Sequence, residues 1–253
     1  MKIVSNKKIL RQLESFQAEL DRQKVAIEQI HNKTNEVLWG ETFNSTICNS
    51  AWLLDKSFSP GRWAVGYPYL YILYRVLNEI KPKNILELGL GESTRMIAQY
   101  ASSHNDAKHI VVEQENQWID FFSNSNHLSK KTELIHLPAA ERVFLEEERA
   151  LIYEDFASTV GGSKYDFISI DGPGPSRSTL YARIDLLELI PNSISDSFCI
   201  LFDDLDLEKC ARTFRLVQEK FDDSGIDFSV GYYEGDKRVG IICSTDNKYL
   251  CSL

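Results

Sequence analysis

Residues 83–98 constrain the fold of this chain more than any other segment, and they read KNILELGLGESTRMIA. An apolar run at 85–88 leads into a turn with two glycines, Gly89 and Gly91, and a helix is expected to begin near Ser93. Glycine allows a tight turn and a close approach of a ligand to the backbone. The free N–H groups at a helix start favour an anionic partner. The segment therefore predicts a ligand-binding strand–turn–helix unit, with a plain connection of the same shape as the alternative.

The glycine spacing narrows the kind of ligand. A dinucleotide-binding turn needs a third glycine where this chain has Thr94, and the sequence contains no P-loop pattern. The segment instead resembles the first motif of class I S-adenosylmethionine-dependent methyltransferases, acid-x-Gly-x-Gly. The spacing of Glu87, Gly89 and Ser93 is most similar to that of small-molecule O-methyltransferases of the catechol and caffeoyl-CoA type. The resemblance implies that Glu87, Gly89, Gly91 and Ser93 hold the methionine portion of S-adenosylmethionine.

Four further apolar runs are expected to be parallel strands covered on both faces. They occupy residues 109–113, 132–138, 165–171 and 198–204. Glu113 ends the first of these runs, 22 residues after Gly91, where nucleotide-binding α/β folds place a ribose-binding carboxylate. The alternative is a solvated strand-end glutamate. The resemblance implies that Glu113 holds the ribose hydroxyls and that the turn at 138–140, with Ala139, lies near the adenine.

Three acids follow the last two of these strands. Asp171 ends one, Asp203 and Asp204 end the other, and the carboxyl ends of parallel strands meet at one edge of a sheet. Three neighbouring carboxylates repel one another, and Mg²⁺ or another divalent cation bound by all three would relieve this and activate a hydroxyl. The resembling metal-dependent enzymes take ligands from the same strand ends, but they have Asp-Asn where this chain has two aspartates. Without metal, Asp171 or Asp203 would be a carboxylate base, or Asp204 or Asp206 would only cap the helix expected at 207–221.

The segment 177–191 has an apolar stripe at helical spacing, which predicts a helix that ends at Pro191. Arg177, in the loop before it, is a candidate to bind an anionic group of the acceptor. Arg183 is also expected close to the cleft and could bind the same group, but a surface pair with Asp185 is the favoured interpretation. Together with the Asp-Gly-Pro and Phe-Asp-Asp runs, this segment resembles a methyltransferase subgroup found among glycan and natural-product enzymes.

Two strand-like runs at 226–233 and 238–244 flank a short turn and predict a β-hairpin. Class I methyltransferases end in such an antiparallel pair, whereas dinucleotide dehydrogenases do not. The expected fold is therefore a doubly wound, mostly parallel, seven-stranded α/β sheet of the Rossmann-like methyltransferase type. The resemblance covers residues 64–246.

The N-terminal region has a different pattern. Apolar residues dominate an unbroken alternation of spacings of four and three, formed by Ile9, Leu13, Phe16, Leu20, Gln23, Ile27, Ile30, Thr34 and Val37. This heptad predicts a coiled coil that joins copies of the chain or docks it to a partner. The alternative is a long helix folded back on its own catalytic domain. Gly40 is expected to end the helix, which gives a helical region at 1–40, a connecting segment at 41–82 and a methyltransferase domain at 83–253.

The connecting segment is rich in aromatic residues between positions 57 and 74. Trp63, Tyr67 and Tyr69 are candidates to stack on a sugar or an aromatic acceptor, or else to pack in the core. Arg62 is a candidate to neutralise an acidic acceptor.

Composition restricts the class of protein. The sequence has 253 residues without an apolar run of membrane-spanning length or a visible signal peptide, which favours a cytoplasmic protein. Five cysteines favour reduced thiols, and a net charge of −9 argues against nucleic acid as a substrate. The sequence as a whole predicts methyl transfer to a hydroxyl of a small molecule, a sugar or a polysaccharide precursor. The alternatives are N-methylation, methylation of an aromatic secondary metabolite, or a non-catalytic coiled-coil binding module.

Overall fold

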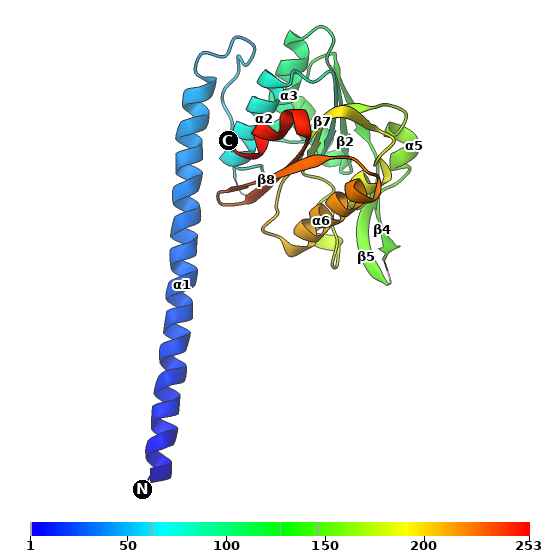
Figure 1. The fold of residues 1–253 in the computed structure, drawn as a ribbon. Coiled ribbons are helices and arrows are strands. Elements are labelled where there is room, and N and C mark those ends of the chain that lie inside the picture. The colour runs from blue at the N-terminus through cyan, green and yellow to red at the C-terminus, as the bar shows by residue number, and fades with distance from the viewer. Residues whose placement is uncertain (1, 62, 127, 146) are drawn as a thin grey trace.

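The computed structural model describes residues 2–61, 63–126, 128–145 and 147–253. A seven-stranded sheet forms the centre of the molecule, in the order β3-β2-β1-β6-β7-β9-β8 (Figure 1). Its strands are β1 (Asn84–Leu88), β2 (Lys108–Glu113), β3 (Thr132–His136), β6 (Tyr165–Ile170), β7 (Ile194–Phe202), β8 (Phe228–Glu234) and β9 (Arg238–Ser244). The pairs among β3, β2, β1, β6 and β7 are parallel, and β9 is antiparallel to both of its neighbours. The structure confirms the doubly wound sheet and its terminal hairpin.

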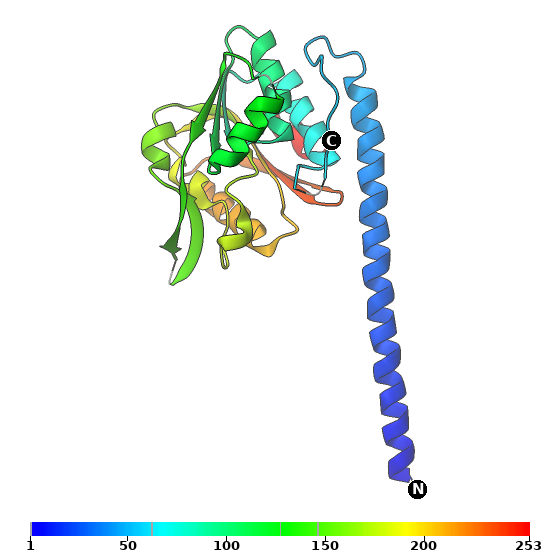
Figure 2. The same ribbon diagram turned by 180° about the vertical axis from the view of Figure 1, so that it is seen from behind.

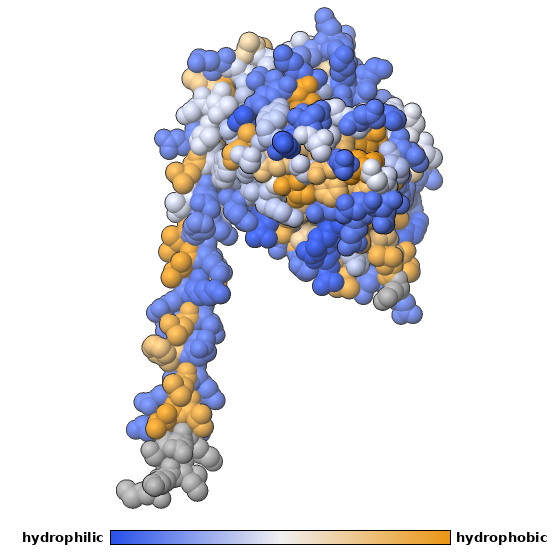
Figure 3. Space-filling model, in the orientation of Figure 1, coloured by the Kyte–Doolittle hydropathy of each residue, from blue (hydrophilic) through white to orange (hydrophobic). Residues whose placement is uncertain are grey.

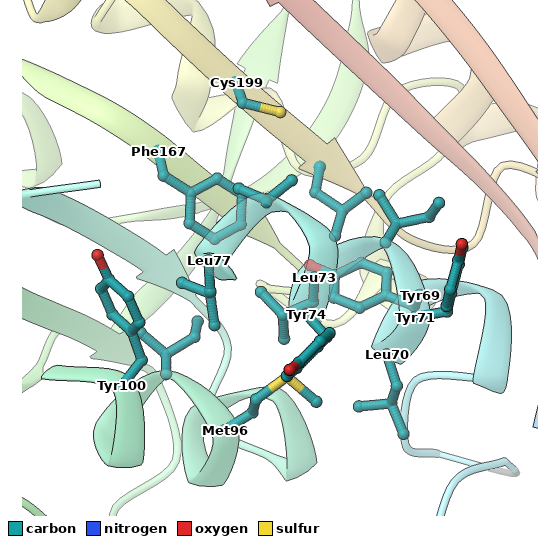
Figure 4. Close-up of a cluster of buried hydrophobic side chains, with 14 of the residues drawn as sticks. Tyr69, Leu70, Tyr71, Leu73, Tyr74, Leu77, Met96, Tyr100, Phe167 and Cys199 are labelled. Carbon is teal, nitrogen blue, oxygen red and sulfur yellow. The ribbon is translucent and has the colours of Figure 1, made fainter. Parts of the chain in front are cut away.

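Helices cover both faces of this sheet, which explains the continuous apolar runs. The helices are α2 (Tyr67–Glu79), α3 (Glu92–Ser103), α4 (Asn116–Ser125), α5 (Phe156–Val160) and α6 (Glu208–Asp223), with a final 3₁₀ segment at Thr245–Cys251. Ile85 of β1 packs in a core with α2 and α3, whereas Leu86, the next residue, packs in a second core with α5 and α6. Figure 4 shows the first core, where Tyr74 of α2 lies next to Met96 of α3.

Two segments differ from the sequence-based expectation. Residues 138–140 do not form only a turn, because a separate hairpin begins there, with β4 (Ala139–Phe144) paired to β5 (Glu148–Tyr153). The helix expected within 177–191 is wrong: the chain forms two short 3₁₀ turns, Pro175–Arg177 and Ile184–Glu188. Arg183 between them has a φ of 62°, a left-handed conformation that interrupts a right-handed helix.

The helix α1 (Lys2–Ile47) extends far beyond the α/β domain (Figures 1 and 2). Residues 8–31 are exposed, so the alternative in which this helix folds back on the domain is wrong for that part. The helix also does not end at Gly40. A Cβ at Gly40 would lie 3.1 Å from the Tyr67 ring, so glycine lets α1 approach the domain closely here, and Phe43 and Ile47 continue the buried contact. Among the described residues, no helix has both the length and the apolar content needed to cross a membrane.

Candidate active site

A cavity of about 810 Å³ opens at the carboxyl edge of the sheet. This volume is within the range of small-molecule sites. Five residues that the sequence singled out lie in its wall, namely Trp63, Gly89, Glu113, Asp171 and Asp204. Four strands end at this edge, and they bring together Gly89, Glu113, Asp171 and Asp204, which span 115 positions of the sequence.

The turn after β1 depends on one glycine more than on the other. Gly89 has a φ of 97°, and a Cβ there would lie 2.9 Å from the backbone nitrogen of Gly172 and 3.0 Å from the carbonyl carbon of Asp171. A side chain at Gly89 would therefore be strained and would push apart the ends of β1 and β6. Gly91 has an extended backbone, and a Cβ there would meet only open space. Its N–H donates to Thr94 Oγ1 at 2.9 Å at the start of α3.

Glu113 is held rigidly in the cavity wall. Its side chain is only 7% exposed, so it is not a solvated strand-end residue. One carboxylate oxygen accepts from the backbone N–H groups of Gln114 (2.7 Å) and Glu115 (2.9 Å), and the other accepts from Leu90 at 3.0 Å. Trp118 Nε1 in turn donates to the Leu90 carbonyl at 2.7 Å, which fixes the indole beside the cavity. An oriented acid and an aromatic ring thus lie side by side on one wall.

The three predicted acids converge as expected. Asp171, Asp203 and Asp204 each have a carboxylate oxygen within 4.8 Å of the others. Two cations already lie among them, which the sequence did not indicate. Arg183 Nη2 donates to Asp171 Oδ1 at 2.9 Å and also to Asp204 Oδ2. Lys237 Nζ lies 3.1 Å from Asp203 Oδ2 and 2.9 Å from Asp204 Oδ1.

Arg183 is buried, and the prediction of a surface pair with Asp185 is wrong. The Arg183 residue is 1% exposed, and its Nη1 donates to the backbone carbonyl of Asp203 at 2.9 Å. Asp185 is also buried and accepts a hydrogen bond from the Tyr153 backbone N–H at 2.8 Å. The sequence placed Arg183 near the cleft but did not indicate its burial among the acids, because Asp185, two positions later, offered a simpler partner.

Sequence reasoning also missed Lys237, which lies in the turn between β8 and β9. The signal that could have indicated Lys237 is the sheet topology. Strand β9 pairs directly with β7, and this places the first residues of β9 beside the end of β7.

The fit of a divalent cation to this cluster is poor. Arg183 and Lys237 between them bond to one oxygen of Asp171, one of Asp203 and both of Asp204. A hard cation would have to displace these groups and sit next to two fixed positive charges. Among the described residues, Asp203 Oδ1 is the oxygen of this cluster that is buried without a hydrogen-bond partner, but Asp203 is fully buried and does not line the cavity.

The surroundings of the three aspartates give them different pKa values. Burial raises the pKa of Asp171 to about 6, against the opposing charge of Arg183. Burial, together with the neighbouring carboxylates, raises the pKa of Asp203 to about 8. Burial also opposes ionisation of Asp204, but the charges of Arg183 and Lys237 outweigh it and lower its pKa. Asp171 is therefore the acid of this cluster that lines the cavity and titrates near neutral pH.

Some of the residues expected to bind the cofactor do not line the cavity. Glu87 is fully buried within the sheet, and its Oε2 lies 3.0 Å from His109 Nε2 on the neighbouring strand. Ser93 is buried in the first turn of α3, and Ala139 pairs with Tyr153 in the β4–β5 hairpin.

Arg177, the expected partner of an anionic acceptor group, also lies outside the cavity. Arg177 has a side chain that is 59% exposed, and its Nε donates to Glu141 Oε1 at 3.1 Å. The helix-capping alternative for the acids is wrong, because the residue that precedes α6 in the N-cap position is Leu207. Asp206 instead accepts from the Arg238 backbone N–H at 3.3 Å.

The aromatic residues just before α2 and in its first turn divide between surface and core. Trp63 is 97% exposed and lines the cavity. Tyr69 is fully buried, and its hydroxyl lies 2.8 Å from Ser169 Oγ. Tyr67 is partly buried and packs against the main core. Arg62 lies outside the described residues.

Solved structures with a similar fold identify the architecture. The structure of the O-methyltransferase TomG from Streptomyces achromogenes, involved in tomaymycin synthesis and in complex with SAM, matches with a TM-score of 0.55 and 15% identity, over 86% of this chain and 99% of that one. A putative O-methyltransferase from Klebsiella pneumoniae matches with a TM-score of 0.50 and 11% identity, over 85% of this chain and 89% of that one. This chain has the class I S-adenosylmethionine-dependent methyltransferase fold. No protein-family model and no curated protein matches the sequence.

The class I methyltransferase fold places the cavity at the usual ligand-binding edge of an open α/β sheet. The Gly89 turn, Glu113 and Asp171 are among the polar groups that meet there.

Proposed function

We propose that this chain is a metal-independent methyltransferase that uses S-adenosylmethionine to methylate a hydroxyl group of a small molecule. The observation that carries the proposal is the convergence of the Gly89 turn, the backbone-fixed Glu113 carboxylate and Asp171 on one cavity. Bound S-adenosylmethionine supplies a methyl group on a positively charged sulfur, which is displaced by an attacking oxygen.

The cofactor is held by the wall that contains Gly89 and Glu113. Each oxygen of an ionised carboxylate can accept about two hydrogen bonds, and Glu113 Oε2 uses one, from Leu90. It can therefore also accept from a ribose hydroxyl. The Trp118 ring and the Gln114 side chain, which lie on the same wall, are suited to contact the adenine. The start of α3, which follows the Gly89 turn, carries the positive end of the helix dipole and favours the negatively charged end of the methionine portion.

Asp171 is the proposed general base. It accepts the proton of the acceptor hydroxyl as the oxygen–carbon bond forms, while the electron pair of the carbon–sulfur bond passes to sulfur. A base with a pKa of about 6 is mostly ionised at neutral pH and still takes up a proton more readily than an ordinary carboxylate. Arg183 orients Asp171 through its 2.9 Å hydrogen bond.

The same cluster makes a metal unnecessary. Arg183 and Lys237 offset most of the charge of the three aspartates, and this is the role that Mg²⁺ would otherwise have. Asp204 stays ionised between the two cations, whereas burial and the neighbouring carboxylates raise the pKa of Asp203 and favour its neutral form.

The acceptor we favour is a sugar hydroxyl, on a free sugar, a nucleotide sugar or a polysaccharide precursor. The exposed Trp63 ring at the cavity offers a flat apolar surface of the kind that stacks on a sugar face. Lys209, in the cavity wall, donates to the carbonyl oxygens of Pro175 (2.7 Å) and Ser178 (3.0 Å) and brings an ammonium group suited to a phosphate or carboxylate on the acceptor. An aromatic hydroxyl or an amine remains the second acceptor class, because Trp63 would stack on an aromatic ring equally well.

The proposal is tested by radiolabelled methyl transfer from S-adenosylmethionine to panels of sugar, aromatic and amine acceptors, with EDTA or with Mg²⁺. We expect transfer to a hydroxyl at equal rates under both conditions. Asp171→Asn should lower the rate by roughly 10²-fold or more. Asp196→Asn is the matched control, since Asp196 is exposed at the opposite end of the sheet, and should not change the rate. Transfer that EDTA abolishes and Mg²⁺ restores would contradict the metal-independent mechanism, and transfer only to nitrogen would contradict the hydroxyl assignment.

A further inference from the structure

The helix α1 has an apolar seam that no described residue covers. The seam consists of the nine heptad residues from Ile9 to Val37, and its apolar members are between 44% and 70% exposed. Figure 3 shows apolar residues recurring along the projecting helix. Most of the exposed large apolar residues of α1 belong to the seam. Leu10 and Leu38 are next to seam residues in the sequence, and Val25 is the exception. A free surface of this kind on a soluble helix normally marks an interface.

The seam does not face the catalytic domain. α1 is fixed to the domain by Glu36, whose carboxylate accepts from the Tyr67 backbone N–H at 2.6 Å, and by Trp39, whose Nε1 donates to the Glu234 carbonyl at 3.0 Å. At 3.6 residues per turn, the face formed by residues 36, 40, 43 and 47 points roughly 130° away from the seam. Val37 accordingly stays 70% exposed although its neighbours are docked. The seam can therefore pair with another helix without moving the domain.

We propose that the seam pairs with the seam of a second copy of this chain, as a parallel, in-register, two-stranded coiled coil. The seam covers about four heptads and roughly 42 Å of helix, which is enough for a stable coiled coil. A heptad seam needs a partner helix with the same repeat, length and polar positions. A second copy meets all three requirements.

The polar residues of the seam select the parallel orientation. In a parallel, in-register pair, Gln23 meets Gln23 and Thr34 meets Thr34, so each polar side chain has a polar neighbour. An antiparallel pair matches polar with polar only if Gln23 lies opposite Thr34. That register places Phe16 and Leu13 opposite Glu41 and Asn44, which continue the seam as exposed polar residues, so it buries apolar side chains against polar ones. The other antiparallel registers bury polar groups against apolar side chains, which is unfavourable.

The charges beside the seam agree with this orientation. Glu19 and Lys24 occupy the g position and the following e position of the heptad, which face each other across a parallel coiled coil. The two-fold symmetry of the pair forms this contact twice.

The mass of the full chain in solution tests the pairing, by light scattering after gel filtration at micromolar concentration. We expect twice the chain mass of 29.0 kDa. Leu20→Glu with Ile27→Glu should give the monomer mass, whereas the control Val25→Glu should keep the dimer, because Val25 is similarly exposed on the same helix but lies outside the seam. All three side chains are exposed, so the variants should keep the circular dichroism spectrum of the catalytic domain. A wild-type monomer, or a double variant as dimeric as the wild type, would overturn the proposal.

Disulfide trapping tests the orientation. In a Cys48→Ser background, which removes the exposed native thiol, Leu20→Cys should form a covalent dimer under mild oxidation and Val25→Cys should not. If Leu20→Cys forms a covalent dimer only when mixed with Val37→Cys, the pair is antiparallel and the orientation is wrong. Neither readout depends on methyltransferase activity.

Discussion

Replacing Arg183 with methionine should destabilise the protein far more than an ordinary loss of one arginine. The Arg183 side chain is 1% exposed and bonds to Asp171 and Asp204, whose side chains are 20% and 13% exposed. Removing one member of a buried ion pair leaves the other charges uncompensated and typically costs about 3–5 kcal/mol. For a chain of this size, such a loss lowers Tm by roughly 6–20 °C.

The loss of stability in this variant should depend on pH, because the variant loses charge pairing rather than packing. Without Arg183, the pKa of Asp171 in the folded chain rises further above its unfolded value, and the lowered pKa of Asp204 rises as well. The folded variant then holds protons that the unfolded chain releases, so its stability falls as pH rises from about 4 through the raised pKa values. The difference in unfolding free energy between wild type and variant should therefore be larger at pH 8 than at pH 5.5.

Urea unfolding followed by tryptophan fluorescence at the two pH values measures this difference. Arg177→Met is the matched control: the Arg177 side chain is 59% exposed and pairs with Glu141 at the surface, so its loss should cost at most about 0.5 kcal/mol. A variant at Arg183 that is as stable as this control, or a loss that does not change with pH, would refute the account of the acid cluster.

Three other predictions concern the cavity and the fold. Glu113→Gln should weaken S-adenosylmethionine binding tenfold or more in a calorimetric titration, because the new NH₂ group would face backbone N–H donors. Glu115→Gln is the control at an exposed neighbouring residue and should bind the cofactor normally. Gly89→Ala should weaken binding and lower Tm, since its Cβ would press on the end of β6; normal binding would contradict the close approach at this turn. Burial raises the pKa of Asp185 to about 7, so its ionisation costs stability as pH rises from about 4 to 7. Asp185→Asn should therefore unfold at a higher Tm than wild type at pH 8 and show no such advantage at pH 4.

Local sequence patterns were sufficient to predict the sheet and part of the candidate site. Gly89, Glu113 and Asp171 each end an apolar run, and the topology of a parallel sheet brings such ends to one edge whatever the intervening loops do. The terminal hairpin was likewise predictable, because strand-like runs flank a short turn.

Patterns failed where long-range charge pairing decided the conformation. The segment 177–191 has helical periodicity, but burial of Arg183 against Asp171 and Asp204 requires a left-handed residue that no helix tolerates. Lys237 belongs to a turn whose position depends on the pairing of β9 with β7. The three acids suggested a metal because no local pattern indicated that Arg183 and Lys237 pair with them.

The central claim is that this cavity binds S-adenosylmethionine without a metal. Calorimetric titration of S-adenosylmethionine into the wild-type chain, in EDTA and again in Mg²⁺, tests it most directly. The account predicts one site per chain with micromolar affinity that is the same in both buffers. No binding in either buffer, or binding only when Mg²⁺ is present, would contradict it.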